Sequence, residues 1–139
     1  MIGTFDNTDL TGKHLLIRQD LNVPLLDGNI GSAKRIDASL PTLLQALAEA
    51  ASVTVMSHLG RPVEGEVDDT LSLKPIADYL SNALGQEVVF EDAHPSKLTP
   101  LDSGIRLLEN VRFWPGEKSN DETLAQSYAG LCDVFVMDA

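Results

Sequence analysis

Short apolar runs alternate with longer segments of helical periodicity along this chain, and this alternation restricts the possible folds more than any other feature. The strand-like runs are rich in Val, Ile and Leu and cover residues 14–19, 52–56, 87–90, 105–108 and 133–137. Chains in which strands and helices alternate form a mostly parallel sheet whose faces are covered by helices. We therefore predict a fold of the α/β class.

The first helical segment covers residues 33–51. Apolar side chains repeat there at intervals of three and four residues, at Ile36, Leu40, Leu43, Leu44 and Leu47. This spacing places them on one face of a helix. Pro41 interrupts the segment, and a kink is expected at that point.

Two further helices are indicated by their termini. Ser72 is placed to cap a helix that has Pro75 in its first turn and Gly85 at its end. Ser119 and Glu122 have the spacing of a capping box, which predicts a helix that runs to about residue 130. With helices between successive strands, we predict a three-layer, Rossmann-like parallel sheet with helices on both faces.

The remaining segments carry turn and loop chemistry. Asn22, Pro24 and the pair Asp27-Gly28 are turn formers, and the pair predicts a tight reversal. Residues 62–71 are acidic and are expected to form a mobile loop. Residues 91–104, with two prolines and one glycine, indicate a connection without a clear element.

The chain has 139 residues, enough for one domain with a sizeable core. Its last predicted strand ends two residues before the final residue. A strand in this kind of fold normally continues into a loop or a crossover, so we expect the sequence to be truncated.

Composition excludes several classes of partner. The net charge of −11 argues against nonspecific nucleic-acid binding, which needs a basic face. No stretch approaches the ~20 apolar residues that span a bilayer, so no membrane partner is expected. The single cysteine, Cys132, lies in an apolar run and predicts a buried structural thiol in a reducing cytoplasm.

Polar loops that contain an arginine follow three of the predicted strands. The loops are residues 18–22, 57–62 and 109–112, and their arginines are Arg18, Arg61 and Arg112. The carboxyl ends of parallel strands lie along one edge of a sheet, where ligands bind. Arg35, at the start of the first helix, is placed to face the same crevice. Because a guanidinium group holds a phosphate or carboxylate through two hydrogen bonds, we predict a site for a small polyanion.

Each of these residues also has a structural interpretation. An arginine after a strand is often a solvated surface residue, and Arg18 inside the strand is placed to pair with a buried carboxylate. His58 alone would more often pack than contact a ligand, and Asp20 and Asn22 readily shape turns. Trp114 is expected to pack. The recurrence of arginine at three strand ends favours the ligand site.

The sequence lacks the motifs of several other kinds of functional site. The sequence contains neither G-x-x-x-x-G-K-[ST] nor G-x-G-x-x-G, the two common cradles for nucleotide phosphates. It contains no H-E-x-x-H and no Cys/His cluster for a metal. Ser57 and His58 are adjacent in sequence, which does not supply the geometry of a nucleophilic triad.

Four blocks of the sequence stand out, namely residues 17–24 (IRQDLNVP), 56–62 (MSHLGRP), 107–113 (LLENVRF) and 133–139 (DVFVMDA). These blocks resemble phosphoglycerate kinases of the bacterial type. They occur in the order and at the spacing of that family, and the resemblance runs from about residue 8 to the end of the chain. Met137 departs from the family pattern, because many members have Asn there.

The resemblance implies that residues 1–139 are the truncated N-terminal, phosphoglycerate-binding domain of a two-domain kinase. It implies a substrate site formed by Asp20, Leu21, Asn22, Arg35, His58, Leu59, Gly60, Arg61 and Arg112. Asp20 and Asn22 would contact the glycerate end of the substrate. His58, Arg61 and Arg112 would bind the phosphate that is not transferred. Arg35 would be the catalytic residue, because it would stabilise the charge of the transferred phosphoryl group.

The family catalyses reversible phosphoryl transfer between 1,3-bisphosphoglycerate and ADP, which yields 3-phosphoglycerate and ATP. By resemblance, Mg-ATP and Mg-ADP would bind a C-terminal domain that this chain lacks. No cofactor or metal is therefore expected in this segment, and the segment alone is expected to be inactive. A cytoplasmic monomer is expected, with 3-phosphoglycerate and 1,3-bisphosphoglycerate as its small-molecule partners.

Two other classes of function remain open from the residues alone. One is a stand-alone anion-binding module without kinase activity. The other is a Rossmann-type nucleotide-binding domain, which the missing glycine fingerprints disfavour. A reading frame that continues past residue 139 into a glycine-rich domain would favour the kinase, and a stop codon there would favour the module.

Overall fold

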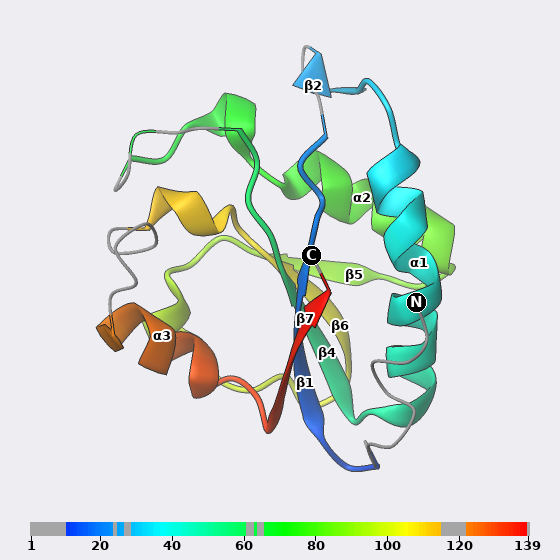
Figure 1. The fold of residues 1–139 in the computed structure, drawn as a ribbon, viewed down its shortest axis with the longest axis vertical. Helices are drawn as coiled ribbons and strands as arrows, with labels where there is room; N and C mark the ends of the chain where they lie inside the picture. The colour runs from blue at the N-terminus through cyan, green and yellow to red at the C-terminus, as the bar shows by residue number, and fades with distance from the viewer. Residues whose placement is uncertain are drawn as a thin grey trace.

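Five parallel strands form the central sheet of the protein. The computed structural model describes residues 11–23, 25–26, 29–60, 63, 66–114 and 122–138. The strands lie in the order β5-β6-β4-β1-β7, and every neighbouring pair is parallel (Figure 1). Their bounds are β1 His14–Gln19, β4 Ser52–Met56, β5 Val88–Glu91, β6 Gly104–Leu108 and β7 Val134–Asp138. All five predicted strands are confirmed, although the last three are shifted or extended by one residue.

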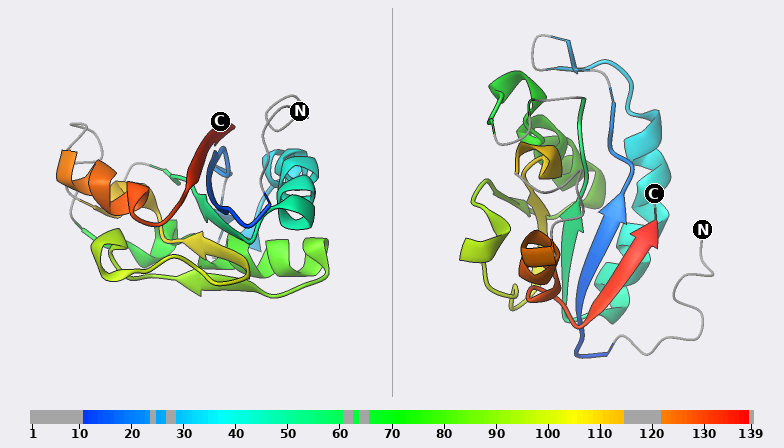
Figure 2. Two further views of the ribbon diagram at one scale, coloured as in Figure 1. Left: turned by 90° about the horizontal axis from the view of Figure 1, so that it is seen from below. Right: turned by 60° about the vertical axis from the view of Figure 1, so that its left-hand side comes forward.

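Helices cover both faces of this sheet, as predicted. The helices α1 (Lys34–Glu49) and α2 (Lys74–Leu84) lie on one face, and α3 (Glu122–Ala129) lies on the other (Figure 2). Successive strand residues supply the two cores in turn. Leu15 and Ile17 of β1 pack in the α1/α2 core, whereas Leu16 packs with residues of α3. The three-layer α/β architecture follows from this alternation, because successive side chains of a strand point to opposite faces.

The termini of the helices differ in part from the prediction. Helix α1 is continuous through Pro41, and the kink expected there stays a prediction. The residue that caps α2 is Leu73, one position after the predicted Ser72, although the Ser72 hydroxyl accepts a hydrogen bond from the N–H of Lys74 at 3.2 Å. Gly85 ends α2 as predicted, in the left-handed region at φ 71°. Helix α3 begins at Glu122, and the predicted cap Ser119 lies outside the described residues.

The connections contain short elements that the sequence did not indicate. Strands β2 (Leu25–Leu26) and β3 (Asn29–Ile30) pair antiparallel on either side of the predicted reversal, whose Asp27 and Gly28 lie outside the described residues, as does Pro24. The acidic segment ends in the 3-10 helix η2 (Asp69–Leu71). The unassigned segment 91–104 contains the 3-10 helix η3 (Pro95–Lys97), whose contacts with α3 cover the second face.

Arg106 holds the segment of residues 91–104 on the sheet. Its side chain is buried, with Nε donating to the Thr54 hydroxyl at 3.0 Å and Nη2 donating to the carbonyl of Thr99 at 2.8 Å. Burial lowers the pKa of the guanidinium, and the charge of Glu91 acts in the opposite direction. Arg106 therefore has a structural role, in accord with its position outside every motif.

The thiol of Cys132 is only partly buried, which corrects the expectation of a fully buried side chain. It packs at the margin of the α3 core, and burial together with Asp133 raises its pKa. Trp114 packs against the same core, as expected, with its ring edge-on to His94 at 5.2 Å between centroids. Among the described helices, none is long and apolar enough to span a membrane.

Candidate functional site

Three loops meet at the carboxyl edge of the sheet. They follow β1, β4 and β6, which are neighbours in the sheet order although they lie far apart in the sequence. Ser57, fully buried, joins all three: its hydroxyl accepts the N–H of Leu21 at 3.0 Å, and its carbonyl accepts the N–H of Val111 at 3.1 Å. The predicted convergence of these loops is confirmed.

Gly60 is the point at which the motif residues of the three loops contact one another. Its N–H donates to Oδ1 of Asn22 at 3.0 Å, and its carbonyl accepts a hydrogen bond from Nη1 of Arg112 at 3.1 Å. Its φ of +61° lies in the left-handed region, which glycine adopts at little cost. A residue with a side chain would be strained there, so the local sequence His58-Leu59-Gly60 suits this turn.

Glu109 and Asn110 lie between β6 and Arg112. Their side chains form hydrogen bonds with the segments next to the carboxyl edge of the sheet. Both side chains are buried. The Glu109 carboxylate accepts hydrogen bonds from the Ser72 hydroxyl at 2.7 Å and from the N–H of Leu73 at 2.9 Å. It therefore supplies acceptors at the start of α2, where helix N–H groups need them. Sequence reasoning placed both residues in a cation-bearing loop but assigned them no role, and the turn preference of Asn110 was the only available signal.

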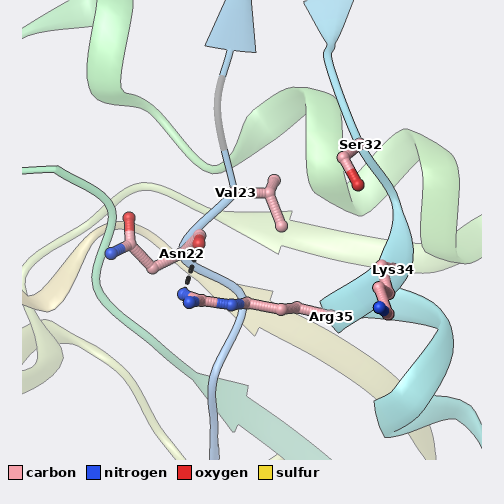
Figure 3. Close-up of a pocket in the computed structure, with 5 residues that line it drawn as sticks. All are labelled: Asn22, Val23, Ser32, Lys34 and Arg35. Carbon is pink, nitrogen blue, oxygen red and sulfur yellow. Dashed lines mark hydrogen bonds between the residues drawn. The ribbon is translucent and has the colours of Figure 1, made fainter.

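Arg35, in the first turn of α1, reaches toward the loop that follows β1 (Figure 3). Its Nη1 donates to the carbonyl of Asn22 at 2.9 Å and lies 3.4 Å from Oδ1 of Asp20. The Arg35 and Asp20 side chains are 56% and 47% exposed, so this ion pair contributes little to stability. Both hydrogen bonds that join Arg35 to described residues use Nη1.

A shallow cavity opens beside Arg35. Its volume is about 240 Å³, and Figure 3 shows the residues that line it: Asn22, Val23, Ser32, Lys34 and Arg35. Lys34 adds a second cation to this wall, and sequence reasoning did not single it out. Both basic side chains lie in the first turn of a helix, whose free N–H groups also favour an anion.

The other predicted site residues differ in how they reach this edge. Leu21 and Leu59 are buried in the core of the α1/α2 face, so only their main-chain groups lie with the loops. His58 is partly buried in the loop after β4. Arg61 lies outside the described residues, and the predicted pairing of Arg18 with a buried carboxylate stays a prediction.

The arrangement is suited to holding charge. Two guanidinium groups, those of Arg35 and Arg112, and the first turn of α1 approach the same edge, and their positive charge favours a phosphate or carboxylate. Within the described ranges, no three residues among His, Cys, Asp and Glu come together in a way that could hold a metal ion. The guanidinium groups of Arg35 and Arg112 make this edge a candidate site for an anion.

Comparisons with known proteins identify the family that shares this sequence. The family model described as "Phosphoglycerate kinase" matches residues 5–139. The phosphoglycerate kinase of Psychrobacter sp. (strain PRwf-1) is 51% identical over 135 residues, which cover 96% of this chain and 34% of that protein. The phosphoglycerate kinase of Legionella pneumophila (strain Lens) is 53% identical over 131 residues, which cover 94% and 33%.

Solved structures agree with the sequence comparison. Phosphoglycerate kinase from Coxiella burnetii superposes with a TM-score of 0.88 at 42% identity, covering 96% of this chain and 34% of its own. The enzyme from Pyrococcus horikoshii OT3 gives a TM-score of 0.77 at 30% identity, covering 94% and 35%. The chain thus spans about one third of the length of the relatives that it matches. With a family match over residues 5–139 and the same fold in two solved relatives, the chain belongs to the phosphoglycerate kinase family.

Proposed function

We propose that residues 1–139 form the N-terminal, phosphoglycerate-binding part of a phosphoglycerate kinase. The whole protein would transfer a phosphoryl group reversibly between 1,3-bisphosphoglycerate and ADP in glycolysis, giving 3-phosphoglycerate and ATP. The observation that carries this proposal is the junction at Gly60, where Asn22 and Arg112 from two other strand-end loops are hydrogen-bonded. Membership of the family supports the reaction, and the cationic edge supports the substrate.

The substrate would lie across the edge of the sheet. Arg112, His58 and Arg61 would bind the phosphate that is not transferred, because they belong to neighbouring loops around Gly60. Asp20 and Asn22 would receive the glycerate end, with the main chain of Leu21, Leu59 and Gly60 completing the wall. The support for this orientation is that Arg35 sits on the far side of Asn22, where a second anionic group of the same molecule would meet it.

Arg35 would act on the group that is transferred. Phosphoryl transfer depends on in-line positioning and on charge stabilisation, and a guanidinium group supplies the second. The acceptor in the direction of ATP consumption is a carboxylate, which is already ionised at neutral pH. The site therefore needs no general base, and an edge of arginines suits the reaction better than a catalytic carboxylate would.

The nucleotide and its Mg²⁺ are assigned to the remainder of the protein. The described residues do not fit a divalent ion, since they contain no cluster of carboxylates or imidazoles that could hold one. The two substrates would meet when the parts of the protein close on each other, which would also exclude water from the acyl phosphate.

We further propose that the protein acts in the cytoplasm as a monomer. The support for a reducing compartment is that residues 1–139 contain one cysteine, and so no pair that could form a disulfide within this segment. Sedimentation of the complete protein tests the monomer, and a dimer at micromolar concentration would contradict it.

Titration of the chain with 3-phosphoglycerate tests the substrate site. We expect NMR shifts at the backbone amides of residues 20–22, 58–61 and 112. Because charge-assisted hydrogen bonds contribute about 1.5 to 3 kcal/mol, Arg112→Ala should weaken binding by about 10- to 100-fold. Lys97→Ala is the charge-matched control, since Lys97 is exposed in η3 and belongs to none of the three loops. Equal weakening by both substitutions, or no shifts in the wild type, would contradict the proposal.

An activity assay separates the kinase from a stand-alone anion-binding module. We expect the complete protein to form ATP from 1,3-bisphosphoglycerate and ADP. The isolated 139-residue chain should form none, because it would hold only one of the two substrates. ATP formation by the purified chain would refute the claim that it holds only one of the two substrates. A complete protein that is inactive but still binds 3-phosphoglycerate would favour the anion-binding module.

A further inference from the structure

We propose that Asn110 is a positioning residue for the phosphate-binding edge, a role that rests on the function proposed above. Asn110 lies between β6 and Arg112 and is completely buried, so it does not contact the substrate. Its side chain fixes the main chain on either side of the site. Through these contacts it sets the separation of Gly60 from Arg112.

The side chain of Asn110 uses each of its polar atoms. Its Nδ2 donates to the carbonyl of Leu59 at 2.7 Å and to the carbonyl of Leu71 at 3.0 Å. Its Oδ1 accepts the N–H of Arg112 at 3.1 Å, which makes Asn110 the cap of the 3-10 helix η4 (Val111–Phe113). A buried amide with two donors and one acceptor all engaged has little freedom to move.

These contacts close a ring around Gly60. One arm runs from Asn110 Nδ2 to the carbonyl of Leu59, and the chain continues directly to Gly60. The other arm runs from Asn110 Oδ1 to the N–H of Arg112, whose guanidinium returns to the carbonyl of Gly60. Asn110 thereby adds side-chain hydrogen bonds to the main-chain bond between Ser57 and Val111 that joins the loops after β4 and β6.

Only an amide fits this position. The carbonyl oxygens of Leu59 and Leu71 both need donors, and Asn110 supplies both from one nitrogen. In Asn110→Asp, a carboxylate oxygen would face those two carbonyls, while the other oxygen could still accept the N–H of Arg112. That variant breaks the arm to Leu59 and leaves the arm to Arg112, whereas Asn110→Ala removes both.

The kinetic effect differs from that of a residue needed only for folding. The phosphate near Gly60 and Arg112 is the one that is not transferred, so it is held equally in the ground state and in the transition state. Loss of such uniform binding raises KM and leaves kcat unchanged. We expect Asn110→Asp to raise the KM for 3-phosphoglycerate by about tenfold or more, since small misplacements of binding groups are costly. The KM for ATP and kcat should change by less than about threefold.

The experiment uses steady-state kinetics of the complete protein, in the wild type and in Asn110→Asp, Asn110→Ala and Ser81→Ala. Ser81→Ala is the matched control, because it removes the acceptor of the Val88 N–H at the opposite end of α2. Partial unfolding in that control should lower the apparent kcat without raising KM. The fraction folded is measured by circular dichroism at the assay temperature.

Each outcome decides the proposal. A raised KM for 3-phosphoglycerate in both Asn110 variants, with KM for ATP and kcat retained, supports it. A fall in kcat alone, as in Ser81→Ala, overturns it. If both Asn110 variants fail to fold while Ser81→Ala folds, Asn110 is a determinant of the fold and the proposal is also overturned. A wild type without kinase activity would refute the proposed function, which is a separate result.

Discussion

Gly60→Ala tests the geometry of the junction in the most direct way. The φ of Gly60 is +61°, and a Cβ built on it would lie 2.7 Å from Cδ2 of Leu71. The backbone cannot swing away freely, because the N–H is held by Asn22 and the carbonyl is held by Arg112. The new methyl group must therefore be accommodated by Leu71.

The expected loss of stability combines three effects. An alanine in the left-handed region costs about 1 to 2 kcal/mol. The added Cβ lowers the entropy of the unfolded chain, which offsets about 0.4 to 1 kcal/mol of that loss of stability. The third effect is the displacement of Leu71, whose side chain is flexible and partly exposed, so a change toward a poorer rotamer costs about 0.5 to 1.5 kcal/mol. We expect a net destabilisation of about 2 kcal/mol.

Urea unfolding of the chain at 25 °C measures this loss. With a slope of about 2 kcal/mol per molar urea, the midpoint should fall by about 1 M. The same substitution in a Leu71→Ala background should cost about 1 kcal/mol less, because the methyl group then has room. A double-mutant cycle isolates that difference as the energy of the clash.

Gly130→Ala is the control for this experiment. Its Cβ would meet only the carbonyls of Gln126 and Ser127 at 3.6 Å, an ordinary van der Waals contact, and its φ is not in the left-handed region. We expect it to be neutral or slightly stabilising. A cost below about 0.5 kcal/mol for Gly60→Ala would refute the argument from φ, and equal costs in both backgrounds would refute the argument from Leu71.

Three further substitutions or treatments test other parts of the structure. Glu109→Ala should lower the free energy of unfolding by about 2 to 4 kcal/mol, because it leaves the donors at the start of α2 without an acceptor. A loss of stability as small as that for an exposed glutamate would contradict the buried contact. Arg106→Lys should lower the free energy of unfolding by about 1 to 2 kcal/mol, since an ammonium group cannot reproduce the two directed hydrogen bonds to Thr54 and Thr99. An unchanged midpoint of urea unfolding would show that these hydrogen bonds are dispensable. Because only the thiolate reacts and burial raises the pKa of Cys132, alkylation by iodoacetamide at pH 8 should be slower in the folded chain than in urea; equal or faster reaction in the folded chain would contradict the raised pKa.

The regular elements of the fold follow from local sequence. The runs around Leu15 and Val53 are apolar at successive positions, as strands covered on both faces must be. The helix that begins at Lys34 follows from the repeat of its apolar side chains, and it continues through Pro41 because tertiary packing offsets the hydrogen bond that proline removes. Helix α2 ends at Gly85 because glycine reaches the left-handed conformation at little cost.

Local sequence was less informative where the stabilising partner lies far along the chain. Ser72 has the chemistry of a helix cap, but the carboxylate of Glu109, 37 residues away, accepts from both Ser72 and Leu73 and moves the cap by one position. Residues 91–104 show no periodicity, because their place is set by Arg106 and by packing against α3. Neither interaction has a signature within a short window of sequence.

The same division applies to the functional site. The sequence by itself determined which strands end in arginine-bearing loops and, through the rule for parallel sheets, that these loops meet at one edge. Only the tertiary structure decided how they meet: Gly60 between Asn22 and Arg112, with Asn110 beneath them. The reason is physical. Strand and helix periodicity are properties of adjacent residues, whereas a partly buried hydrogen bond between residues 38 to 52 positions apart depends on distances that exist only once the sheet has formed.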